Sequence, residues 1–259
     1  MSFRSVSLIR TRPLEKRLRN SISLGMTADR NAPVASSKAS ADVAAFLEAA
    51  KLAPTRAAPR AKLIFALDAT MSRQATWDMA QELQGKMFDA AAKIGGLDVQ
   101  LVYFRGRDEC RASRFVSGGQ GLAELMSRIH VHGGLTQIRK VLRHVGAEAR
   151  RERVGALVYV GDAMEEAIDP VIAVAGEIAL IGVKAFMFQE GDDVATRRAY
   201  KEIARVTGGA YGAFDAGAAA RLEALLKAAA SYAAGGAAAL RALADSAPEA
   251  RALLQQMRD

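Results

Sequence analysis

The chain has 259 residues, of which 51% are hydrophobic and 25% are charged. This composition is typical of a globular protein and excludes a wholly disordered, collagen-like or fibrous chain. The single cysteine, Cys110, excludes an internal disulfide framework and an all-cysteine zinc site, and we expect a cytoplasmic protein.

The N-terminal region, residues 1–60, carries most of the formal net charge of +8, because it holds eleven basic and only four acidic residues. Residues 1–25 are rich in arginine and serine but contain no apolar run of signal-peptide length. They fit either a transit peptide or an extension upstream of a natural start at Met26, and without them the net charge would be +3. Their only aromatic residue is Phe3, so we expect no nucleic-acid partner despite the basic charge.

Helices and strands are expected to alternate along most of the chain. We expect residues 1–60 to be largely flexible, with one short helix over 40–52 that Ser40 caps and Pro54 follows. The nearly continuous apolar run at 62–68 then predicts a strand that is buried on both faces. Apolar spacing predicts the following elements in order: helix 74–93, strand 99–104, an edge strand at 111–116, helices 121–130 and 136–149, strand 154–160, helix 170–182, strand 184–188, helix 194–207, strand 210–214 and helix 217–232.

This order of elements predicts an α/β fold, with a doubly wound, mainly parallel central sheet and helices on both faces. We divide the chain into the N-terminal region 1–60, a main domain at 61–232, and a helical tail at 233–259 that is rich in alanine and leucine. Gly235-Gly236 breaks the chain near the start of this tail, and Pro248 separates its two helical pieces.

We expect neither a transmembrane segment nor a membrane partner. The most apolar stretch, residues 171–188, is interrupted by Glu177 and Lys184. It is better explained as a buried helix followed by a buried strand.

Oxygen-bearing side chains follow several of the predicted strands and turns. In open α/β sheets, ligands bind at the carboxyl ends of the strands, so these side chains are expected at one face of the domain. Carboxylate and hydroxyl oxygens are ligands that Mg²⁺ and Mn²⁺ prefer. Each of these side chains could instead cap a neighbouring helix or turn. We predict a Mg²⁺ or Mn²⁺ site formed by Asp68, Thr70, Ser72, Thr136 and Asp162.

The spacing of these residues resembles that of the von Willebrand factor A (vWA) domain. The stretch 68–72, Asp-Ala-Thr-Met-Ser, matches the family's Asp-x-Ser/Thr-x-Ser pattern after a buried strand. Thr136 follows a Gly-rich turn, and Gly161-Asp162 follows a later strand, in the order that the family has them. The resemblance covers residues 61–232 and implies the vWA fold with its metal-ion-dependent adhesion site.

The resemblance also implies a role for each residue of the site. Thr70 and Ser72 would coordinate the ion through their hydroxyls, and Thr136 would do so directly or through water. Asp68 and Asp162 would supply negative charge, directly or through bound water. At the position of Thr70 the family more commonly has serine, so this chain keeps the hydroxyl but adds a methyl group beside the ion.

A non-catalytic protein-interaction module of a bacterial, intracellular type is the function that the resemblance implies. A partner protein would supply an Asp or Glu carboxylate to the ion. AAA+ ATPases and stress-response complexes are partners of such modules, and the sequence does not select among them. The chain lacks a Gly-x-x-x-x-Gly-Lys-Ser/Thr loop, so an ATPase would be a separate chain.

A Mg²⁺-dependent phosphatase that resembles the haloacid dehalogenase superfamily is the alternative. Asp68 would be its nucleophile, and Asp162 would hold the ion with Asp169 nearby. Thr70 stands where most such enzymes have a second aspartate as general acid, so proton transfer to the leaving group would be lost. We expect the pair His130 and His132 to be polar loop residues, and Cys110 to be inert.

Overall fold

The computed structural model describes residues 4–5, 60–70, 74–215 and 218–257. The expected helix at 40–52 and most of the expected flexible N-terminal region lie outside the described residues. Ser72 also lies outside them.

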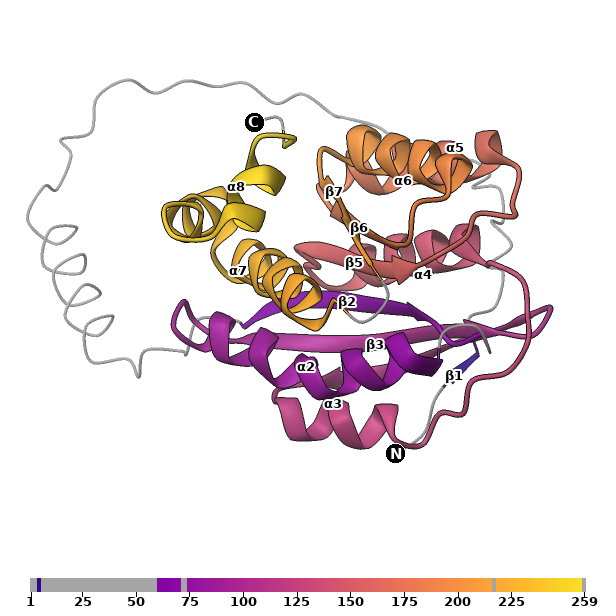
Figure 1. Cartoon of the computed structure of the whole chain (residues 1–259), viewed down its shortest axis with the longest axis horizontal. Coiled ribbons are helices and arrows are strands. Elements are labelled where there is room, and N and C mark those ends of the chain that lie inside the picture. Colours follow the sequence, from indigo (N-terminus) through magenta and orange to yellow (C-terminus); the bar gives the residue numbers. More distant parts are fainter. Residues whose placement is uncertain (1–3, 6–59, 71–73, 216–217, 258–259) are drawn as a thin grey trace, which may run out of the picture. The chain divides into compact units, whose positions relative to one another are not determined.

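A seven-stranded sheet forms the centre of the described chain, with the strand order β1-β4-β3-β2-β5-β6-β7 (Figure 1). Strands β3, β2, β5, β6 and β7 run parallel to one another, whereas β4 is antiparallel to β3 and β1 is antiparallel to β4. The strands are β1 (Arg4–Ser5), β2 (Ala61–Asp68), β3 (Leu97–Arg105), β4 (Glu109–Val116), β5 (Ala156–Gly161), β6 (Lys184–Glu190) and β7 (Ala210–Phe214). The mainly parallel sheet that was predicted from the sequence is therefore confirmed.

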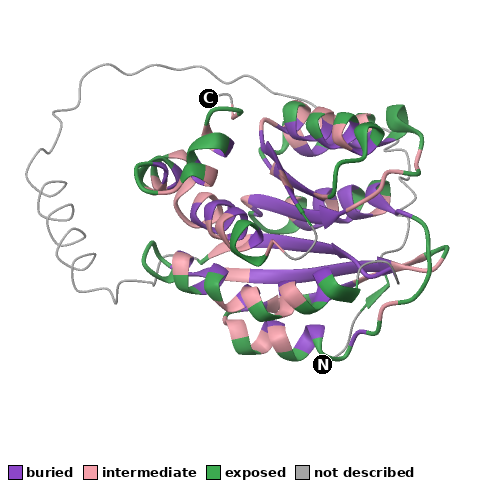
Figure 2. Cartoon of the chain, in the orientation of Figure 1, coloured by how far each residue is buried: buried purple, intermediate pink, exposed green. Residues whose placement is uncertain are grey.

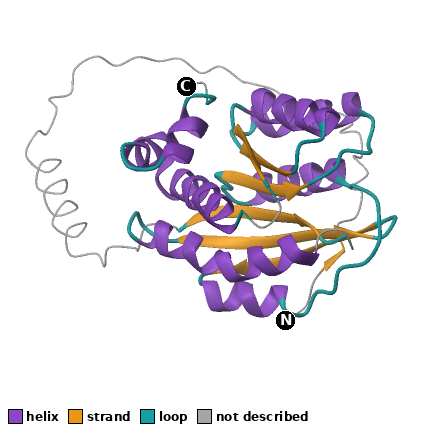
Figure 3. Cartoon of the chain, in the orientation of Figure 1, coloured by secondary structure: helices purple, strands orange, loops and turns teal. Residues whose placement is uncertain are grey.

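Helices cover both faces of this sheet, which gives a three-layer arrangement (Figure 3). In β2, Leu63 and Phe65 pack into the layer that contains α2, α3, α7 and α8. Ile64 and Ala66 alternate with them and pack into the layer of α4, α5 and α6. The helices are α2 (Gln74–Ala92), α3 (Gly119–Met126), α4 (Ile138–Arg151), α5 (Ile168–Leu180), α6 (Val194–Thr207), α7 (Ala219–Ala244) and α8 (Pro248–Leu254).

Burial follows these layers. The central strands are buried on both sides, and exposed residues gather on the outer sides of the helices and in the loops (Figure 2). This explains why the central strands are nearly continuous apolar runs, whereas the helices α4 and α6 are amphipathic. No helix among the described residues combines the length and the apolar character needed to cross a membrane.

Strand β4, which was predicted at the edge of the sheet, instead has a further strand beside it. Arg4 and Ser5 of β1 pair with Ala112 and Arg111 of β4. The Arg4 side chain also forms an ion pair with the buried Glu148 of α4. A strand of only two residues has no alternating apolar pattern, so the sequence alone gave no indication of β1.

The residues after Gly235-Gly236 pack into the main domain. The predicted break at Gly235-Gly236 is confirmed, because Gly236 has a non-helical backbone, and its φ of 66° is a left-handed conformation that favours glycine. The range α7 thus contains two helical pieces joined at this kink. Leu240 of α7 and Leu253 of α8 are buried in the same apolar layer as α2 and α3. The predicted helical tail therefore contributes to the core.

Gln256, just beyond α8, connects the tail directly to the sheet. Its side-chain nitrogen donates to the backbone oxygen of Tyr211 in β7, and its side-chain oxygen accepts from the backbone N–H of the same residue, both at 3.0 Å. The sheet and the helices α7 and α8 thus belong to one structural unit.

Truncation of a tail side chain is expected to destabilise the whole domain. Leu253→Ala should lower the free energy of unfolding by about 2–5 kcal/mol, because it leaves a cavity in the core. Leu253 is 1% exposed, whereas Leu180 at the end of α5 is 92% exposed and provides a matched control. Leu180→Ala should change the free energy by no more than about 0.5 kcal/mol. Urea unfolding measures both, and equal effects of the two substitutions would contradict the packing of the tail.

Candidate metal centre

Asp68 ends strand β2 and Asp162 follows the neighbouring strand β5, both at the carboxyl edge of the sheet. Leu67 of β2 pairs with Val160 of β5 in a parallel register, so the two acidic residues leave the sheet side by side. Asp68 is only 3% exposed, and its Oδ1 accepts a hydrogen bond of 2.8 Å from the backbone N–H of Thr70. This bond closes a tight turn after β2 and fixes the orientation of the carboxylate.

The segment between α3 and α4 is held across the end of β2. The backbone N–H of His132 donates to the oxygen of Ala69 at 2.9 Å, and the N–H of Leu135 donates to the oxygen of Gly106 at 3.0 Å. Gly134 lies against the turn between β3 and β4, where an added Cβ would be 2.2 Å from the nitrogen of Gly106. Two backbone bonds and a glycine–glycine contact therefore position this segment.

Thr136 is joined to the loop after β5 by a reciprocal pair of hydrogen bonds. Its backbone N–H donates to Oε2 of Glu165 at 2.8 Å, and its Oγ1 accepts from the backbone N–H of Glu165 at 3.0 Å. The threonine hydroxyl keeps a second lone pair and its own proton. Glu165 follows Asp162 by three residues, so this pair places Thr136 at the loop that carries Asp162.

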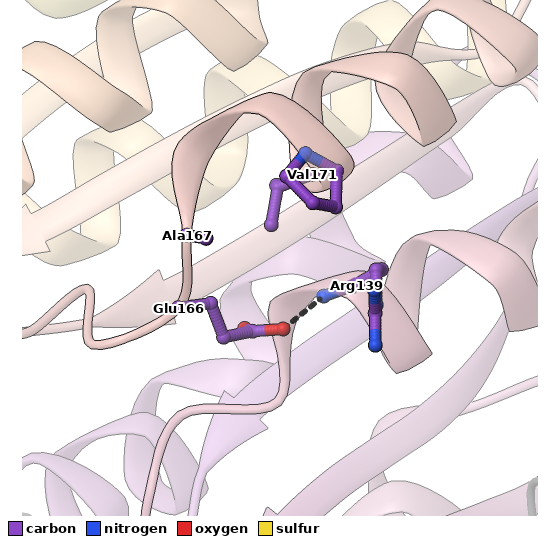
Figure 4. Close-up of a pocket in the computed structure, with 5 residues that line it drawn as sticks. Arg139, Glu166, Ala167 and Val171 are labelled. Carbon is purple, nitrogen blue, oxygen red and sulfur yellow. Dashed lines mark hydrogen bonds between the residues drawn. The ribbon is translucent and has the colours of Figure 1, made fainter.

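Glu166 caps the N-terminus of α4 from the same loop. Its carboxylate accepts from the backbone N–H groups of Ile138 and Arg139, the latter at 3.1 Å (Figure 4). Burial raises the pKa of Glu166, while the two N–H groups act to lower it. A carboxylate at a helix N-terminus satisfies otherwise unpaired N–H groups and interacts favourably with the helix dipole.

A small cavity of about 200 Å³ lies beside this cap (Figure 4). Its lining residues come from the first turns of α4 and α5 and from the loop before α5. They are Arg139, Glu166, Ala167, Pro170 and Val171.

The structure brings four of the five predicted metal ligands to one edge of the sheet. Asp68, Thr70 and Thr136 are buried, Asp162 is half-buried, and Ser72 lies outside the described residues. Two carboxylates and two hydroxyls form a donor set that fits a hard divalent cation such as Mg²⁺ or Mn²⁺. Across the described ranges, no three His, Cys, Asp or Glu side chains gather closely enough to hold an ion, so a site here depends on the hydroxyls.

The other residues considered from the sequence lie apart from this site or are unreactive. His130 and His132 are exposed, whereas His144 is buried on α4, so the three imidazoles do not form a cluster. Burial raises the pKa of the Cys110 thiol to about 12, which keeps it protonated and unreactive.

Glu165 and Glu166 were not identified from the sequence. Each acts on a segment that lies 27 to 29 residues earlier in the chain. Only their position directly before a predicted helix, in a loop that already carries Asp162, could have drawn attention to them.

Solved structures with the same arrangement of strands and helices identify the fold. A von Willebrand factor type A protein from Catenulispora acidiphila matches 68% of this chain with a TM-score of 0.56 and 15% sequence identity. The pilus adhesin SpaC from Lactobacillus rhamnosus GG matches 68% with a TM-score of 0.54 and 12% identity. The proximal thread matrix protein 1 from the mussel byssus matches 68% with a TM-score of 0.51 and 18% identity.

The chain has the vWA fold. The matched region spans 43% of the Catenulispora chain, 30% of SpaC and 48% of the mussel protein. No family model and no curated protein matches the sequence. At identities of 12 to 18%, the structural likeness establishes the vWA fold and not the activity of any of these proteins.

Proposed function

We propose that this vWA domain is a non-catalytic protein-interaction module that binds its partner through a divalent cation. The arrangement of three loops at one edge of the sheet carries this proposal. The N–H of His132 bonds to Ala69, and Thr136 bonds to Glu165, so the segments that hold the proposed ligands are tied directly to one another. These hydrogen bonds between the segments preorganise the oxygen ligands, so less ordering of the segments is needed when an ion binds.

The proposed ligands are Asp68, Thr70, Ser72, Thr136 and Asp162, with Mg²⁺ or Mn²⁺ as the cation. The hydroxyls would hold the ion, and the two aspartates would supply the negative charge that retains it. The ion would offer one position to an Asp or Glu of the partner. A carboxylate–metal contact concentrates charge in a small area, and therefore contributes to specificity.

For the partner, we propose another protein, such as an AAA+ ATPase or a component of a stress-response complex, in the cytoplasm of a bacterial cell. This part of the proposal depends on the family resemblance alone. The binding experiment described below tests it directly.

No observation in the described chain favours the phosphatase alternative. A nucleophilic aspartate must meet a phosphate ester, whereas Asp68 is almost fully buried and one of its oxygens accepts the N–H of Thr70. The proposed general acid is also absent, because Thr70 occupies that position. The geometry therefore supports ion binding better than covalent catalysis.

Asp68→Asn is expected to weaken cation binding without unfolding the protein. The amide has the shape of the carboxylate but lacks its charge, so the affinity for Mn²⁺ should fall by at least about tenfold. Asp169→Asn is a matched control, because Asp169 is an exposed carboxylate in the first turn of α5. Calorimetric titration with MnCl₂ measures the affinity, and circular dichroism reports the fold.

Partner binding is tested with the same variants. A protein from the native cell extract should be retained by the wild type and Asp169→Asn in Mg²⁺, and lost in EDTA or with Asp68→Asn. The proposal is wrong if the wild type does not bind Mn²⁺ at millimolar concentration, or if Asp68→Asn binds it as tightly as the wild type does.

A further inference from the structure

Two tyrosines lie directly beneath the loop that carries Asp162. Tyr159 of β5 and Tyr200 of α6 are both fully buried, and their rings meet edge to face with centroids 5.5 Å apart. Phe104 of β3 stacks on Tyr159, with ring centroids 6.0 Å apart. These three buried rings form an aromatic cluster, and Tyr200 connects it to the loop after β5.

The Tyr200 hydroxyl makes a specific contact with this loop. It donates a hydrogen bond of 3.0 Å to the backbone oxygen of Ala163, the residue after Asp162. The bond is partly buried, and a carbonyl group there without a donor would cost free energy, so the hydrogen bond favours the loop position that Tyr200 can reach.

The absence of a side chain at Gly161 allows the two tyrosine side chains to lie close to the end of β5. A Cβ at Gly161 would lie 2.7 Å from the Tyr200 hydroxyl and 3.0 Å from Cε1 of Tyr159. Any larger residue at the end of β5 would therefore push the two rings away from the loop. Gly161 thus has a packing role, in addition to being part of the Gly161-Asp162 pair that resembles the vWA pattern.

The Tyr159 hydroxyl remains a neutral phenol beside the acidic site. Burial raises its pKa well above the ordinary value, and the electrostatic interactions with Tyr200 and Asp68 raise it further. Tyr159 therefore adds no negative charge next to Asp68 and Asp162.

We propose that Tyr200 is a positioning residue, which fixes the loop after β5 and with it the carboxylate of Asp162. The loop is held on its other side by the bonds from Glu165 to Thr136 and from Glu166 to α4. Tyr200 supplies the third attachment, at the point closest to Asp162. The consequence for the metal rests on the proposed function, whereas the effect on the loop does not.

Tyr200→Phe tests this role, with Tyr211→Phe as a matched control. Both changes remove the hydroxyl of a buried tyrosine that makes a hydrogen bond, since the Tyr211 hydroxyl bonds to Oε1 of Gln189 at 2.7 Å. Amide hydrogen exchange in residues 162–167 should accelerate about three- to tenfold in Tyr200→Phe and remain unchanged in Tyr211→Phe. The Mn²⁺ affinity of Tyr200→Phe should fall by about tenfold or more, with Tyr211→Phe close to the wild type.

The two readouts separate this inference from the proposed function. Equal exchange in the two variants would overturn the positioning role, whether or not the protein binds a metal. Faster exchange with unchanged Mn²⁺ affinity would overturn the link from Tyr200 to Asp162. If the wild type does not bind Mn²⁺, the proposed metal site fails, and the exchange data still decide whether Tyr200 holds the loop.

Discussion

Gly134→Ala is expected to disrupt the candidate metal centre and to destabilise the domain. The new methyl group would overlap the backbone of Gly106, at 2.2 Å from its nitrogen and 2.5 Å from its oxygen. Backbone atoms cannot rotate away as a side chain can, so the segment that ends in Thr136 must move. We expect the free energy of unfolding to fall by about 1–3 kcal/mol. Mn²⁺ affinity should fall by about tenfold or more, because Thr136 is displaced.

The neighbouring glycine provides a close control. A Cβ at Gly133 would meet no atom within 4 Å, and neither Gly133 nor Gly134 has a positive φ. Gly133→Ala should therefore leave stability within about 0.5 kcal/mol of the wild type and leave Mn²⁺ affinity unchanged. Urea unfolding and MnCl₂ titration of both variants test this, and identical behaviour would show that the contact with Gly106 does not position Thr136.

Acidification is expected to destabilise the protein through His144. This side chain is 7% exposed, and its Nε2 is hydrogen bonded to Oε1 of Gln100 at 2.8 Å. Burial lowers the pKa of His144 to about 4; the charge of Arg4 also lowers it, while Glu148 raises it. In the unfolded chain histidine has a pKa of about 6.5, so the unfolded state takes up a proton first as the pH falls. The free energy of unfolding therefore falls as the pH drops below 6.5, and at pH 4 it is about 3 kcal/mol lower than above pH 6.5.

Replacing His144 should remove this part of the pH dependence. His144→Gln is expected to lower stability at neutral pH, but to lose less stability than the wild type between pH 6.5 and pH 4. His132→Gln should retain the wild-type slope, because His132 is exposed. Urea unfolding at several pH values gives the slopes, and parallel curves for the wild type and His144→Gln would exclude His144 as the origin of the acid sensitivity.

The fold could be predicted because the central strands are buried on both sides. Their side chains are apolar in near-continuous runs, such as 62–68 and 154–160, and turns and amphipathic helices separate them. The same pattern located Asp68 and Asp162, since ligand-binding residues in such sheets follow the strands directly.

The contacts that position the loops of the site could not be predicted in this way. Glu165, Tyr200 and Gly134 act on segments that lie 28 to 37 residues away in the chain, through contacts that exist only once the layers are packed. No local periodicity marks such contacts. The tail was also difficult to place, because a run of alanines and leucines predicts a helix without indicating which surface it covers.

The hydrogen bonds between Gln256 and Tyr211 also cover backbone groups of strand β7. Strand β7 is the last strand in the sheet order, and an outermost strand offers backbone groups to which another chain can add. Gln256 occupies both backbone groups of Tyr211, and the Arg221 side chain donates to the oxygen of Ala213 at 2.6 Å. Two side chains, one from the first turn of α7 and one from the residues after α8, thus occupy backbone groups with which an added strand would pair, and this disfavours edge-to-edge association.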